Sequence, residues 1–117
     1  MSIRTQIERC IQQVTTRDGE ISATLCFDKD FIGFQGHFPQ NPILPGICFL
    51  EIVLILIQRL KGKSVHMTEL VASKFFAVVL PDQTVIVDCT LKEDAVIAYI
   101  KIGTQRISQI KMKVAYA

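Results

Sequence analysis

A long uninterrupted apolar stretch is absent from this sequence of 117 residues. The longest one, Ile47 to Ile57, contains Glu51 and falls short of the roughly 20 apolar residues that a bilayer-spanning helix needs. Near the N-terminus, Arg4, Glu8 and Arg9 interrupt any apolar core of the kind that a signal peptide requires. We therefore expect a cytoplasmic protein that does not insert into membranes.

An excess of one charge is also missing. The chain has 13 Lys and Arg against 11 Asp and Glu, a net charge of +2, and no basic block stands out. This balance argues against a nucleic-acid partner. Because 50% of the residues are apolar, the chain is not a disordered one. Its length fits a single domain, 1–117, that can bury a core without a metal or a disulfide.

The cysteines lack the spacing of a metal site. Cys10, Cys26, Cys48 and Cys89 form no Cys-x-x-Cys pair, and no histidine lies at zinc-ligand distance along the chain. Each cysteine sits among apolar neighbours. We interpret all four as small buried hydrophobic residues in a reducing compartment and expect no metal site.

One long helix dominates the pattern. It is predicted to open at Pro45-Gly46, where proline suits a helix start, and to run to about Lys61. Gly62 suits its C-terminal cap. The segment from Ile47 to Ile57 is apolar on all faces, so the helix must be covered on most sides, which places Ile47 in the core.

The rest of the chain indicates β structure. At the N-terminus, helical spacing from Ile3 to Val14 competes with a hairpin around Arg17–Glu20, and we favour the hairpin. An antiparallel sheet curled around the central helix accounts for both patterns and defines an α+β fold. The predicted strands are Arg9–Thr16, Ile21–Phe27, Val65–Leu80, Thr84–Leu91, Ala95–Ile102 and Arg106–Tyr116.

The segment from Asp28 to Leu44 is predicted to be a long loop, because it contains two glycines and two prolines. Loops of this length in a compact domain are usually functional. His37 lies in its rigid Gly/Pro part, and histidine is the side chain that exchanges a proton near neutral pH. His37 is therefore a candidate catalytic base.

Glu51 and Gly46 complete a possible reaction centre. A carboxylate is rarely buried without a partner, and burial favours its neutral form, so we expect Glu51 to be a protonated acid. Amide groups in the first turn of a helix lack internal partners, and the N–H of Gly46 could bind a developing oxyanion. Base, acid and oxyanion donor suit proton abstraction next to a carbonyl.

The central motif resembles that of a known enzyme family. The segments Gly36–Pro39 and Asn41–Ile47, followed by Glu51, are similar to the signature of the 3-hydroxyacyl-acyl-carrier-protein dehydratases. These are the hot-dog-fold enzymes of type II fatty-acid synthesis. The interval of fourteen residues from His37 to Glu51 matches the catalytic pair of that family, and weaker similarity extends from Ile21 to Tyr116.

The resemblance implies dehydration of (3R)-3-hydroxyacyl thioesters, held on acyl carrier protein, to trans-2-enoyl thioesters. It implies that His37 removes the C2 proton, that Glu51 protonates the departing 3-hydroxyl group and that Gly46 donates to the thioester carbonyl. We assign Phe38, next to His37, and Ile47, next to Gly46, to substrate binding. For Ile47 the resemblance thus gives a place in an acyl tunnel as the alternative to the core. No cofactor is expected beyond the carrier's phosphopantetheine arm.

The family also implies a homodimer or a higher oligomer of dimers, in which base and acid come from different subunits. This chain departs from the family pattern at Ile55, usually Gln, and at Phe76 and Ala77, where basic residues are expected. Two alternatives therefore stay open. One is a hot-dog acyl thioesterase, and the other is a non-catalytic acyl-binding or assembly subunit.

A basic cluster near the end of the predicted helix has two interpretations. Its members are Arg59, Lys61 and Lys63. They could stabilise the helix dipole beside a solvated turn, or they could dock an acidic carrier protein.

Overall fold

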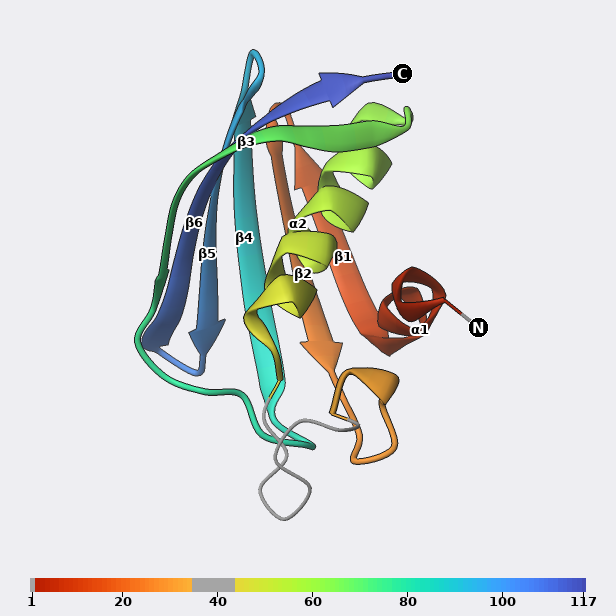
Figure 1. Cartoon of the computed structure of the whole chain (residues 1–117), viewed down its shortest axis with the longest axis vertical. Helices are drawn as coiled ribbons and strands as arrows, with labels where there is room; N and C mark the ends of the chain where they lie inside the picture. The colour runs from red at the N-terminus through yellow and green to blue at the C-terminus, as the bar shows by residue number, and fades with distance from the viewer. Residues whose placement is uncertain (1, 35–43) are drawn as a thin grey trace.

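The computed structural model describes residues 2–34 and 44–117 (Figure 1). Among these residues, six strands form one antiparallel sheet in the order β1-β2-β4-β5-β6-β3. The elements are α1 (Ile3–Cys10), β1 (Ile11–Arg17), β2 (Glu20–Cys26), a 3-10 helix (Ile32–Phe34), α2 (Gly46–Lys61), β3 (Val65–Phe75), β4 (Thr84–Lys92), β5 (Ala95–Ile102) and β6 (Gln105–Tyr116).

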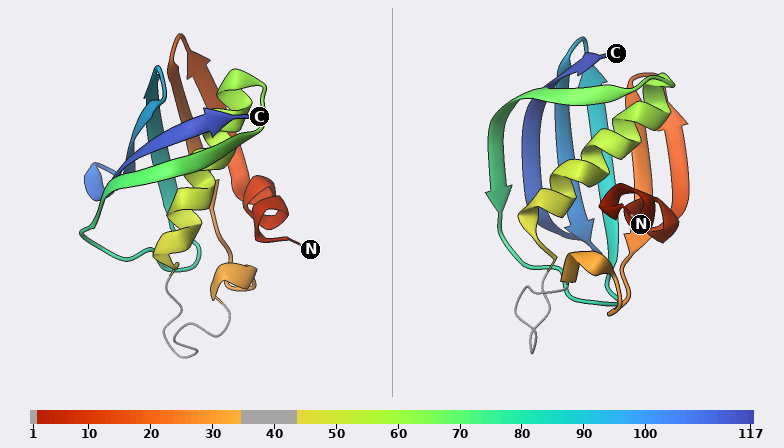
Figure 2. Two further views of the ribbon diagram at one scale, coloured as in Figure 1. Left: turned by 45° about the horizontal axis from the view of Figure 1, so that its top comes forward. Right: turned by 45° about the vertical axis from the view of Figure 1, so that its right-hand side comes forward.

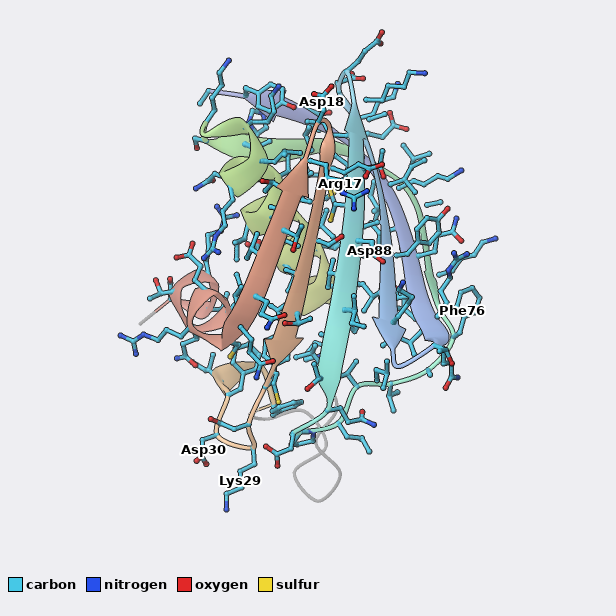
Figure 3. The ribbon with its side chains drawn as sticks, turned by 180° about the vertical axis from the view of Figure 1, so that it is seen from behind. Arg17, Asp18, Lys29, Asp30, Phe76 and Asp88 are labelled. Carbon is cyan, nitrogen blue, oxygen red and sulfur yellow. The ribbon has the colours of Figure 1, made fainter. Side chains whose placement is uncertain are left out.

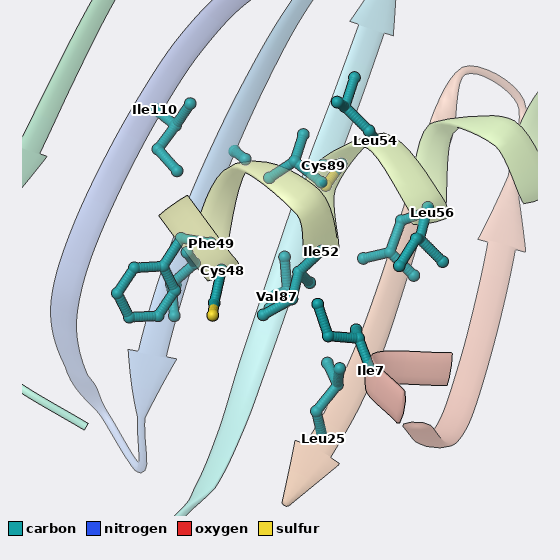
Figure 4. Close-up of a cluster of buried hydrophobic side chains, with 14 of the residues drawn as sticks. Ile7, Leu25, Cys48, Phe49, Ile52, Leu54, Leu56, Val87, Cys89 and Ile110 are labelled. Carbon is teal, nitrogen blue, oxygen red and sulfur yellow. The ribbon is translucent and has the colours of Figure 1, made fainter. Parts of the chain in front are cut away.

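The sheet curls around α2, which crosses its concave face (Figures 1 and 2). The predicted architecture, an antiparallel sheet around one central apolar helix, is confirmed. Alternate residues of β4, such as Val85 and Val87, point to the helix and are fully buried. Buried apolar side chains surround α2 (Figure 4). The buried residues of the helix itself are Cys48, Phe49, Ile52, Val53, Leu54, Ile55, Leu56 and Ile57.

The predicted limits of the central helix are correct. Pro45 is the N-cap residue with extended backbone angles, and α2 ends at Lys61. Gly62 follows with φ 66° and ψ 24°, a left-handed conformation that glycine adopts without a steric penalty. Its N–H donates to the carbonyl of Gln58 at 2.8 Å, which closes the last turn.

The N-terminal segment combines the two competing predictions. Residues Ile3–Cys10 form α1, and β1 begins at Ile11 rather than at Arg9. Ser2 caps the helix by accepting from the N–H of Thr5, and the fully buried Ile7 fixes α1 to the core. The predicted hairpin forms β1 and β2. The prediction of strand at Arg9 was wrong, because the apolar spacing at Ile3, Ile7 and Cys10 keeps this part helical.

Strand β3 lies at the edge of the sheet and ends at Phe75, not at Leu80. The N–H of Phe76 still donates to the carbonyl of Ile107 in β6 at 2.8 Å. Further along, the carbonyl of Val79 accepts from the N–H of Leu44 instead of pairing within the sheet. This bond ties the segment after β3 to the residues that enter α2. Six large apolar side chains in this part of the chain are exposed: Leu70, Val71, Phe75, Phe76, Val78 and Leu80.

The prediction that all four cysteines are buried is correct for two of them and wrong for the other two. Cys48 and Cys89 are buried, whereas Cys10 and Cys26 are partly exposed because they lie where α1 meets the sheet and at the end of β2. All four thiols are free. Among residues 2–34 and 44–117, neither α1 nor α2 has the length and apolar character that a membrane-spanning helix requires.

Candidate active site

The start of α2 is fixed by the chain on either side of it. Leu44 is buried, and its N–H donates to the carbonyl of Val79 at 2.9 Å. Pro45 then fixes the backbone direction, and the helix begins at Gly46. The first amide groups of an α-helix have no internal acceptors and carry the positive end of its dipole. This turn is therefore chemically suited to bind a carbonyl oxygen that becomes negative.

An aromatic ring lies against this first turn. A methyl group on Gly46 would be 3.2 Å from Cζ of Phe75, so only glycine leaves the ring undisturbed. Phe75 also stacks on the buried Phe49, with centroids 5.5 Å apart and planes at 29°. No role for Phe75 was predicted from the sequence. The glycine was the available signal, since glycine at a helix start often marks a close approach.

Ile47 is the most exposed of the apolar residues on α2, at 61% of its surface. The interpretation of Ile47 as a core residue is therefore wrong. It points away from the core because the buried stripe of α2 begins one residue later, at Cys48. The alternative, contact with an acyl substrate, stays a prediction.

From the sequence we expected Glu51 to be a buried carboxyl group without a partner. The structure contradicts this expectation. Arg4 of α1 donates to its Oε2 from Nε at 3.1 Å and from Nη2 at 2.9 Å. The two side chains form an ion pair in which Glu51 keeps 28% of its surface exposed. Arg4 was missed because it lies 47 positions away in a stretch without any motif.

Burial and the charge of Glu51 both act on a neighbouring thiol, that of Cys48. Burial, which has the larger effect, and the negative charge of Glu51 together raise the pKa of Cys48 to about 11. Cys48 is therefore a protonated packing residue and not a nucleophile near neutral pH.

Gly46 and Glu51 lie on different sides of α2. Five residues separate them, which places them roughly 140° apart around the axis and about 7.5 Å apart along it. Gly46 faces Phe75 of β3, and Glu51 faces Arg4 of α1. Within one chain the structure does not bring these two candidates together. The predicted base His37 and the predicted substrate contact Phe38 lie outside the described residues.

A cavity of about 560 Å³ lies at the other end of α2. Arg17 and Asp18 line it at the β1–β2 turn (Figure 3). Arg59 and Lys61 also line it and belong to the last turn of α2, where cations stabilise the helix dipole. This cavity is mixed in charge and remote from Gly46, so we do not assign it to the candidate active site.

Solved structures place the architecture in the hot-dog fold. The chain superposes with a TM-score of 0.83 on a chain of the dehydratase heterocomplex ApeI:P from Xenorhabdus doucetiae, at 23% identity, covering 90% of this chain and 96% of that one. A hypothetical thioesterase with coenzyme A from Streptococcus pneumoniae gives 0.70 at 8% identity, covering 98% and 94%. The predicted hot-dog fold is confirmed.

The family follows from the sequence comparison. The model of the ApeI-like family, described as ApeI dehydratase, matches residues 12–111. The chain belongs to the ApeI-like dehydratase family, and the resemblance to the 3-hydroxyacyl-acyl-carrier-protein dehydratases is confirmed.

Curated relatives carry the same dehydratase name. The 3-hydroxyacyl-acyl-carrier-protein dehydratase FabZ of Latilactobacillus sakei is 36% identical over 67 residues, which are 51% of this chain and 48% of the relative. The FabZ of Oenococcus oeni is 35% identical over 92 residues, 73% of this chain and 65% of the relative. The match to the first of these spans about half of its length.

Proposed function

We propose that this protein dehydrates (3R)-3-hydroxyacyl thioesters, carried on acyl carrier protein, to trans-2-enoyl thioesters. The family supports the reaction class. The observation that carries the proposal is Glu51, which stands at the position that the motif assigns to a catalytic carboxyl group. Its side chain is anchored by Arg4 and is still 28% exposed, so a substrate can reach it.

The reaction breaks two bonds of the substrate and forms a double bond and a molecule of water. In this proposal His37 takes the proton from C2, the C2=C3 double bond forms and the C3–O bond breaks. The amide of Gly46, in the first turn of α2, binds the thioester oxygen while negative charge builds up on it. The hydroxyl group leaves as water when it has received one proton.

The ion pair changes the role that we propose for Glu51. The sequence suggested a neutral acid that supplies the proton to the leaving hydroxyl group. A carboxylate paired with Arg4 accepts hydrogen bonds and has no proton to supply. We therefore assign to Glu51 the binding of the 3-hydroxyl group, and to His37 the return of the C2 proton to the departing oxygen.

We further propose a homodimer formed through β3. Among the described strands β3 pairs only with β6, and its outer edge carries exposed apolar side chains such as Val71. An edge of this kind is a template for pairing with another chain. Light scattering on the protein as it elutes from a size-exclusion column measures its mass and tests this proposal. We expect Val71→Lys to give monomers and Val14→Lys, on the opposite edge strand β1, to leave the dimer intact.

A heterodimer is the other possible outcome, since the structural relative from Xenorhabdus doucetiae is described as a heterocomplex. A purified chain that is monomeric before any substitution would contradict the homodimer.

Hydrolysis of the thioester is the second candidate. The ion pair favours it, because a carboxylate can act as a base that activates water. One observation separates the two reactions. Dehydration leaves the thioester intact and adds a conjugated double bond, whereas hydrolysis releases a free thiol.

The test is turnover of a short (3R)-3-hydroxyacyl thioester on a carrier mimic, with enoyl absorbance and free thiol followed in parallel. We expect enoyl product from the parent and a loss of kcat of about 100-fold or more in His37→Ala and Glu51→Gln. Glu8→Gln, an exposed position on α1, is the matched control and should keep the parent rate. Thiol release supports hydrolysis, and binding without turnover supports an acyl-binding subunit.

A further inference from the structure

We infer that Arg4 is a positioning residue for Glu51: it holds one carboxylate oxygen so that the other faces the bound thioester substrate. The inference rests on the proposed function to the extent that Glu51 acts on the substrate. It assigns a role in the reaction to α1, an element that precedes the sheet and that the candidate motif does not include.

The geometry of the contact is asymmetric. Nε and Nη2 of Arg4 both donate to Oε2 of Glu51, at 3.1 and 2.9 Å. Among the described residues Oε1 accepts no hydrogen bond. The two donors of a planar guanidinium fix the direction of the side chain more strictly than one donor could. One oxygen is therefore held by the protein, and the other is available to a hydroxyl group or to water.

Arg4 is itself held in place by the packing of α1. The helix is capped at its start by Ser2, whose Oγ accepts from the N–H of Thr5 at 3.1 Å. One turn after Arg4, Ile7 is fully buried in the core. The side-chain Oε1 of Gln6 accepts from the N–H of Ile32 at 3.2 Å, which joins α1 to the loop that follows β2.

This anchoring places α1 beside α2 at the β1 edge of the sheet (Figure 2). A side chain held from two elements loses little further freedom when a substrate binds, and small misplacements of a catalytic group can be costly in rate. Arg9, on the same helix, is exposed and makes no ion pair with any described residue. The contrast makes Arg9 a matched control for Arg4.

The experiment is a double-mutant cycle on turnover. We expect R4Q to lower kcat roughly 10- to 100-fold with little change in KM, because the orientation of Glu51 and not substrate binding is lost. R9Q should keep the parent kcat. In the E51Q background R4Q should add less than about a twofold further loss, since Arg4 acts through Glu51.

Rescue by lysine separates positioning from simple packing. R4K keeps the charge but lacks the planar pair of donors, so we expect a kcat between those of R4Q and the parent. Thermal unfolding shows whether each variant folds. If R4Q does not fold, R4K alone decides: a kcat below the parent value at unchanged KM supports the inference, and the parent value overturns it.

The outcomes separate this inference from the proposed function. Thiol release by the parent overturns dehydration, and the cycle is then measured on hydrolysis. A parent that turns over no thioester overturns both proposals. An active parent whose R4Q variant keeps its kcat, or loses as much in the E51Q background as in the parent, overturns the role of Arg4 alone.

Discussion

The ring of Phe75 lies over Gly46, so that a methyl group on the glycine would be 3.2 Å from Cζ of the ring. Residues from the edge strand and from the start of the central helix therefore meet at the turn that we propose binds the thioester oxygen. Phe75 is 47% exposed and stacks on Phe49, so it forms a half-exposed wall of this turn.

This contact predicts a coupling between two substitutions. Gly46→Ala keeps the backbone amide but forces the ring to shift by a few tenths of an ångström, at a cost of about 1 kcal/mol in the free energy of unfolding. In a Phe75→Leu background the added methyl group meets no ring, and the cost should largely disappear. Denaturant unfolding of the two single variants and the double variant measures the coupling. An equal cost in both backgrounds would contradict the contact.

A polar cluster on the outer face of the sheet predicts a pH-dependent stability. Asp88, visible in Figure 3, accepts from Ser22 at 2.7 Å and pairs with Lys101 at 2.9 Å. Burial acts to raise the pKa of Asp88, but the hydrogen bonds from Lys101 and Ser22 and the charge of Lys101 outweigh it and lower the pKa.

Because the pKa of Asp88 is lower in the folded state, its stabilising effect is present above the unfolded value, about 3.9, and is lost as the pH falls through the folded value. Both side chains are more than a third exposed, so we expect Asp88→Asn to cost only about 0.5–1 kcal/mol at pH 7. The cost should shrink below about pH 4. Asp94→Asn, at an exposed turn, is the control, and a cost independent of pH would refute the charge effect.

The buried thiols should be inert in the native protein. Burial first and the charge of Asp88 second raise the pKa of Cys89 to about 12, and the pKa of Cys48 is raised to about 11. At pH 8 both are protonated as well as inaccessible. Iodoacetamide followed by mass spectrometry should label neither residue until the chain is denatured. Rapid native labelling of either would show that this part of the core opens.

The left-handed conformation of Gly62 at the C-cap of α2 predicts that the loss of stability depends on which residue replaces it. Gly62 has φ 66°, and a methyl group there would meet no atom within 4 Å. Gly62→Ala should therefore lower the free energy of unfolding by about 1–2 kcal/mol through the backbone conformation alone. Gly62→Asn should cost less, because asparagine tolerates this conformation. Equal costs in thermal or denaturant unfolding would point to a different cause.

The sequence by itself determined the elements whose signals are local. Proline and glycine mark both ends of α2, and alternation of apolar and polar residues defines β5 from Ala95 to Ile102 as observed. Capping and side-chain periodicity depend on residues a few positions apart, so they can be read without knowledge of the fold. The motif around Glu51 likewise sufficed to indicate the family.

Only the tertiary structure decided which of these residues meet. Arg4 and Glu51 are 47 positions apart, and Phe75 reaches Gly46 from the far edge of the sheet. The charge partner of Glu51, the exposure of Ile47 and the end of β3 at Phe75 depend on how α1, α2 and the sheet pack together. Such contacts arise from the register and curvature of the whole sheet, and no local pattern in the sequence encodes them.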